Sequence, residues 1–161
     1  AAYYSCGCDS RELFAGFKIA QHKDFEKQKL AAALQLLLPG MPMIYYGDEV
    51  GIEGGPDPDC RRGMLWDKNR QNQSLLQYYQ TLIRIRHTYP VLTKGSIAEQ
   101  YTEDEKGLFY STRHLGDQYI TVIFHTKTGA VKLPELVGRQ NLIEGQSFSG
   151  TLGAYETAVL V

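Results

Sequence analysis

This 161-residue chain has no excess of either charge, since 17 Lys and Arg residues balance 18 Asp and Glu residues for a net charge of −1. A near-neutral chain has no general electrostatic attraction to nucleic acid or to acidic membranes. Long hydrophobic runs are also missing. The longest, residues 30–38, is interrupted by Gln35 and is too short to cross a bilayer. We therefore expect neither a nucleic acid nor a membrane as partner.

Cysteine is scarce, because Cys6, Cys8 and Cys60 are the only three in the chain. Such low density excludes a disulfide-rich scaffold. Cys6 and Cys8 lack a second Cys or His pair to complete a four-ligand metal site, and the four histidines lie far apart in the sequence. We expect structural or unpaired thiols, no metal, no cofactor and a reducing, cytoplasmic location.

The first residues also lack the features of a secretory signal. Residues 1–6 have no basic segment and no long apolar segment follows them. The chain has no initiator Met, so we expect that it was processed or cut from a longer protein.

Two helices are predicted before residue 90. The first begins at Asp24, a good N-cap, and has apolar residues at helical spacing up to Pro39-Gly40, which end it. The second covers about residues 74–89, with Asn72 or Ser74 as its cap.

An apolar segment at residues 41–47 lies between these helices and is bounded by turn residues, as is typical of a strand covered on both faces in an α/β protein. A stiff loop rich in Gly and Pro follows at residues 51–62. A lone strand of this kind cannot be buried by itself. We therefore expect residues 1–90 to be the tail of a larger α/β sheet, and we expect the isolated chain to self-associate or to be locally disordered.

The chain after Pro90 has a different pattern, in which short β-branched and aromatic runs alternate with turn signals. The runs lie at residues 107–111, 119–124, 130–133, 141–143 and 154–161, with hairpin turns at residues 114–117 and 144–145. This pattern predicts a small antiparallel β-sandwich of six or seven strands over residues 91–161.

Two motifs resemble a known family. Residues 39–51, PGMPMIYYGDEVG, resemble the eighth barrel strand of α-amylase-family glycoside hydrolases. Residues 57–67, DPDCRRGMLWD, are similar to the neopullulanase, cyclomaltodextrinase and maltogenic amylase branch, although related α-glucosidases have a variant of this motif. The resemblance implies the end of a (β/α)₈ TIM barrel over residues 1–90, with its last strand at about 41–47 and last helix at about 74–89, followed by the C-terminal β domain at 91–161.

The same resemblance implies the candidate site. Asp57 and Arg61 would bind substrate, since an ionised carboxylate accepts hydrogen bonds from sugar hydroxyls and a guanidinium donates to their oxygens. Arg62 is expected to be structural. The nucleophile and acid of a retaining glycosidase, about 5 Å apart, would come from earlier strands, so we expect no catalytic residue here. Asp9 is left open as a degenerate third catalytic-site acid.

Three further residues have a functional alternative that we consider weaker. Asp48 and Glu49 resemble a carboxylate pair, but neighbours on a strand point to opposite faces, so we expect them to anchor a loop. Trp66 could stack on a sugar, but its flanking Met64 and Leu65 favour a place in the core.

The resulting hypothesis is the C-terminal segment of a glycosidase that cleaves α-1,4 bonds, with α-1,6 bonds left open, in cyclodextrins, pullulan or maltooligosaccharides. Its partner would be an α-glucan, and the segment alone would be inactive. Two alternatives stay open: a non-catalytic carbohydrate-binding or interaction module, and an α-glucosidase or trehalose-forming relative.

Overall fold

The computed structural model describes residues 24–54 and 58–161. The chain divides into two compact units. Among the described residues, the first unit contains residues 24–36 and most of 40–80, and the second contains residues 37–39 and 81–161. The predicted boundary between barrel and β domain, at residue 90, stays a prediction.

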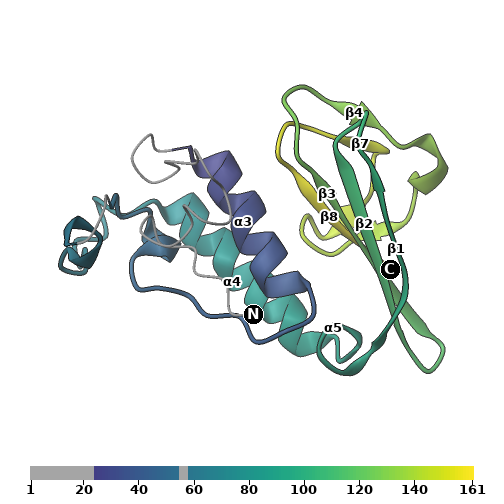
Figure 1. Ribbon diagram of the computed structural model, residues 1–161, viewed down its shortest axis with the longest axis horizontal. Helices are drawn as coiled ribbons and strands as arrows, with labels where there is room; N and C mark the ends of the chain where they lie inside the picture. The colour runs from purple at the N-terminus through teal and green to yellow at the C-terminus, as the bar shows by residue number, and fades with distance from the viewer. Residues whose placement is uncertain (1–23, 55–57) are drawn as a thin grey trace. The chain divides into compact units, whose positions relative to one another are not determined.

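The first helix of the described residues is α3, Phe25–Leu37 (Figure 1). Asp24 caps it as expected, because the backbone N–H of Lys27 donates to Asp24 Oδ1 at 3.3 Å. The helix ends two residues before Pro39, which confirms the predicted end. No helix in residues 24–54 and 58–161 is both long and apolar enough to cross a membrane.

Helix α4, Gln73–Thr88, confirms the second predicted helix. Its cap is Asn72 rather than Ser74, because Asn72 Oδ1 accepts a hydrogen bond from the N–H of Leu75 at 3.0 Å. The N–H of Asn72 donates in turn to the carbonyl of Val50 at 3.0 Å. The start of α4 is thereby fixed to the turn that follows residues 41–47.

The strand expected at residues 41–47 is not present in this structure. Only Met43 has a bridge pairing, and Met41 is 88% exposed rather than buried on both faces. A strand needs continuous hydrogen bonding to a neighbouring strand, and no ladder forms along this segment. Its place in a barrel therefore stays a prediction. The 3₁₀ turns η1, Asp48–Val50, and η2, Asp59–Arg61, follow it.

The second unit is mostly antiparallel sheet. A short helix α5, Val91–Lys94, precedes eight strands in the described part of the chain, which also contains the 3₁₀ turn η3, Pro134–Leu136. The strands are β1 Ser96–Glu103, β2 Leu108–Leu115, β3 Gln118–His125, β4 Val131–Lys132, β5 Gln140–Asn141, β6 Gln146–Ser147, β7 Thr151–Leu152 and β8 Thr157–Leu160. They form one sheet in the order β1-β2-β3-β8-β5-β6 and a second sheet of β4 and β7.

Both sheets contribute to one apolar core. Leu108 and Ile123 come from the larger sheet and Val131 and Leu152 from the smaller, and all four belong to a single buried cluster. This confirms a two-sheet antiparallel module. The expected six or seven strands were too few, because β1, β6 and β7 were not among the predicted runs.

The β2–β3 hairpin has the predicted turn. Gly116 opens its two-residue loop with a φ of 59°, a value at which glycine avoids the strain of a side chain. The β5–β6 hairpin confirms the second turn, since the N–H of Gly145 donates to the carbonyl of Asn141 at 2.8 Å.

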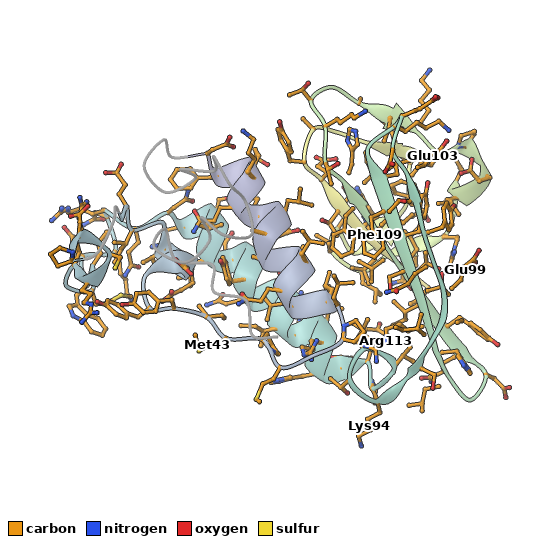
Figure 2. All side chains as sticks on the ribbon, viewed as in Figure 1. Met43, Lys94, Glu99, Glu103, Phe109 and Arg113 are labelled. Carbon is orange, nitrogen blue, oxygen red and sulfur yellow. The ribbon has the colours of Figure 1, made fainter. Side chains whose placement is uncertain are left out.

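Arg113 on β2 connects the sheet to α5 (Figure 2). Its guanidinium is almost wholly buried and donates to the carbonyls of Leu92 and Gly95. Burial lowers the pKa of Arg113, and the nearby charge of Arg86 lowers it further. Arg113 thus donates to backbone carbonyls at the end of α5, where helix carbonyls have no donor within the helix itself.

Candidate functional site

The loop at residues 51–62 holds both residues expected to bind substrate. Arg61 is the last residue of η2 and its side chain is exposed. Asp57 lies outside the described residues, as does Asp9. The proposed Asp57–Arg61 pair therefore remains a prediction, with one partner placed at the surface.

Arg62 forms the structural contact expected of it. Its Nε donates to Asp59 Oδ1 and its Nη2 to Asp59 Oδ2, both at 2.7 Å. This hydrogen bonding, together with the charge of Asp59, raises the pKa of Arg62. The carbonyl of Arg62 also accepts a hydrogen bond from the hydroxyl of Tyr46 at 2.9 Å. The loop is thereby connected to the end of the 41–47 segment.

A small hollow lies beside this connection. It is lined by Tyr45, Tyr46, Gly47, Asp48, Ile52, Glu53, Gly54, Cys60 and Arg62, and its volume is about 10 Å³. A space of this size holds about one water molecule. The described part of the loop therefore has no sugar-sized cavity at this hollow.

Asp48 and Glu49 anchor the turn, as expected, although they lie on η1 and not on a strand. Asp48 is buried, and its carbonyl accepts a hydrogen bond from Gln28 Nε2 at 2.7 Å. Glu49 Oε2 accepts one from the N–H of Gly47 at 2.9 Å. Gly47 has a φ of 96°, which favours glycine. The backbone carbonyl of Asp48 and the carboxylate of Glu49 therefore hold the turn, as expected of a loop anchor.

Cys60, directly before Arg61 and Arg62 in the loop, is disulfide-bonded. The other cysteines of the chain, Cys6 and Cys8, lie outside the described residues. The expectation of structural or unpaired thiols was therefore wrong for Cys60. Sequence spacing could not reveal the bond, because cysteines far apart in sequence pair only through the fold.

Trp66 corrects a second expectation, because its side chain is 81% exposed rather than in the core. Polar groups fix the turn around it: Gln71 Nε2 donates to the carbonyl of Leu65 at 2.7 Å, and the N–H of Asn69 donates to Asp67 Oδ1 at 3.0 Å. The flanking residues are thus held by local hydrogen bonds, and the indole remains at the surface.

Within residues 24–54 and 58–161, no group of three or more His, Cys, Asp or Glu side chains is arranged to hold a metal ion. The described part of the candidate site therefore contains the exposed side chain of Arg61 and the bidentate ion pair between Arg62 and Asp59. Tyr45 and Tyr46 line the same small hollow as Arg62.

Several curated proteins are similar to this chain in sequence, although no protein-family model matches it. A neopullulanase 2 of Thermoactinomyces vulgaris is 35% identical over 133 residues, covering 79% of this chain and 23% of that protein. A cyclomaltodextrinase of Geobacillus thermopakistaniensis is 34% identical, covering 78% and 22%. An intracellular maltogenic amylase of Bacillus subtilis is 36% identical, covering 68% and 18%. The chain spans about a fifth of the length of these relatives.

Solved structures show the same architecture. A maltogenic amylase from S. marinus matches with a TM-score of 0.75 and 27% identity, over 84% of this chain and 19% of that one. A cyclic α-maltosyl-(1→6)-maltose hydrolase from Arthrobacter globiformis, solved in complex with cyclic α-maltosyl-(1→6)-maltose, matches with a TM-score of 0.70 and 32% identity, over 88% and 31%.

Proposed function

Since this chain is related over most of its length to α-amylase-family enzymes of the neopullulanase, cyclomaltodextrinase and maltogenic amylase group, we propose that it is the C-terminal part of such a glycoside hydrolase. The whole enzyme would cleave α-1,4 bonds in cyclodextrins, pullulan or maltooligosaccharides, and α-1,6 bonds are a second candidate. The observation that carries the proposal is the similarity to these enzymes, which extends over most of this chain.

The role proposed for this segment is to supply the loop residues Asp57 and Arg61 to the substrate, together with a stabilising β domain. Arg61 is exposed at the surface of the loop, while Arg62 and Asp59 hold the loop beside it. The reacting carboxylates would come from other strands of a (β/α)₈ barrel, so the segment alone would be inactive.

A cytoplasmic location is proposed because a relative is named an intracellular maltogenic amylase. The disulfide at Cys60 argues in the opposite direction, since disulfides persist mainly in oxidising compartments. Trapping free thiols at the moment of cell lysis distinguishes a cytoplasmic location from an oxidising compartment. Alkylation of Cys60 supports the cytoplasm, whereas protection until a reductant is added contradicts it.

A carbohydrate-binding module is the second candidate, favoured by the separate apolar core of the second unit. Affinity electrophoresis in soluble starch distinguishes it: retardation of the chain that persists without residues 1–90 would support this module. Comparison of cyclodextrin, linear maltooligosaccharides and trehalose as substrates of the whole protein distinguishes the α-glucosidase and trehalose-forming alternatives.

Arg61→Ala in the whole enzyme tests the loop assignment. Hydrogen bonds to a charged group contribute about 1.5–3 kcal/mol, so we expect kcat/KM on β-cyclodextrin to fall about 10-fold to 100-fold. Arg70→Ala is the matched control, because Arg70 is also exposed in the first unit but follows the loop. An equal loss in both variants, or no loss in Arg61→Ala, would contradict the assignment.

A further inference from the structure

A second hollow lies within the second unit, between the last turn of α4 and the β5–β6 hairpin. Its volume is about 260 Å³. The side chains that line it are Arg84, Ile85, Thr88, Tyr89, Gln140 and Leu142. This volume is just below the range of small-molecule sites and suits a ligand of one or two rings.

The floor and one wall of this hollow are held rigidly. Ile85 and Leu142 are buried and form the apolar part. Asn141, almost wholly buried, accepts hydrogen bonds at Oδ1 from the N–H groups of Ile143 and Val159, both at 3.2 Å. The hairpin is therefore fixed to β8, and little ordering of this wall is needed when a ligand binds.

The rim of the hollow has polar groups available for a ligand. Arg84 and Gln140 are exposed and Tyr89 is half-buried. Among the described residues, no hydrogen bond within the protein uses the side-chain polar atoms of these three. Arg84 thus offers guanidinium donors and Gln140 an amide that can donate and accept. Tyr89 offers a hydroxyl group and the face of its own ring.

The chemistry of the lining favours a neutral, hydroxylated ring. A cation is disfavoured because no carboxylate is among the described residues of the lining, and a multiply charged anion is disfavoured because Arg84 is the only charged side chain among them. A purely apolar ligand would leave the rim groups without partners. A sugar ring instead presents C–H groups to an aromatic face and hydroxyls at its edge.

We propose that this hollow binds one glucose unit of an α-glucan, with the ring of Tyr89 against the face of the sugar and with Arg84 and Gln140 hydrogen-bonded to its hydroxyls. The choice of a neutral sugar rests on the lining, and the choice of an α-glucan rests on the proposed function. The proposal adds a carbohydrate site built by residues other than Asp57 and Arg61.

The test is a titration of the ¹⁵N-labelled 161-residue chain with maltose, followed by amide chemical shifts. We expect saturable shifts at Ile85, Tyr89 and Gly145, and a weaker response to the β-linked disaccharide cellobiose. Tyr89→Ala should raise the Kd for maltose about 3-fold to 10-fold through loss of the aromatic contact, and exposed Gln140→Ala should also raise it. Tyr119→Ala and Gln77→Ala, which change exposed residues that do not line the hollow, should leave the Kd unchanged.

Four outcomes would overturn the proposal: no saturable shift at these amides, equal binding of cellobiose, competition of inorganic phosphate with maltose, or an equal loss in the control variants. The Arg61→Ala chain separates this site from the proposed function, since it should still show the maltose shifts at Ile85 and Gly145. Normal cyclodextrin turnover by the whole enzyme, without maltose shifts, would contradict this inference alone.

Discussion

At the scale of single residues, Tyr110 shows how the fold changes the chemistry of a side chain. Its ring stacks on that of Tyr101, with centroids 4.4 Å apart, and lies in the core of the second unit. Burial raises the pKa of Tyr110 well above its ordinary value, and the neighbouring Tyr101 and Glu103 raise it further.

This shift predicts a loss of stability in alkali. The unfolded chain releases the Tyr110 proton near pH 10, its ordinary pKa, while the folded chain retains it. The unfolded state then binds fewer protons, so the free energy of unfolding should fall as pH rises above about 10. Urea unfolding from pH 8 to 11 measures the slope.

Tyr110→Phe should reduce that slope, because it removes the titrating hydroxyl while the ring stays in place. Tyr119→Phe, at an exposed tyrosine of β3, is the control and should keep the slope of the natural chain. Identical slopes in all three proteins would show that Tyr110 does not carry the effect.

Residue-level predictions from sequence succeeded where the cause is local. The caps Asp24 and Asn72 follow from hydrogen bonds that each residue makes within three positions. Trp66 was placed wrongly because burial depends on what the fold brings to the residue, which its neighbours Met64 and Leu65 do not determine. The pairing of Arg62 with Asp59 was within reach of sequence reasoning, while the disulfide at Cys60 was not.

At the scale of elements, the start of α4 depends on one side chain. Asn72 accepts the N–H of Leu75, while Ser74 lies inside the helix and is exposed. Asn72→Ala should lower the free energy of unfolding by about 1 kcal/mol. Ser74→Ala should change it by less than about 0.5 kcal/mol, as expected for a surface substitution. Denaturant titration of both variants provides the check, and a larger loss in Ser74→Ala would refute Asn72 as the cap.

The two helices were predictable because their apolar residues recur at helical spacing, whereas β1 was not. Every residue of β1 except Glu103 is exposed, so residues 96–103 have no apolar alternation that marks a strand. The prediction of a strand at residues 41–47 was wrong for the opposite reason. Their apolar run favours a buried strand, but a strand forms only against a hydrogen-bonding neighbour.

At the scale of the whole molecule, exposed apolar side chains in the first unit predict self-association of the isolated chain. Met41 is 88% and Trp66 81% exposed, and exposed apolar surface favours contact with other molecules. Light scattering should give a mass that rises with concentration. Met41→Ser with Trp66→Ser should reduce the rise, while Tyr119→Ser in the second unit should not. A constant monomer mass would contradict this prediction.

The assignment to an α-glucan hydrolase is tested most directly by reducing-sugar release from β-cyclodextrin, measured in parallel for residues 1–161 and for the protein encoded by the complete reading frame. The account predicts turnover by the complete protein and none by residues 1–161. Turnover by residues 1–161, or none by a folded complete protein on any α-glucan, would contradict it.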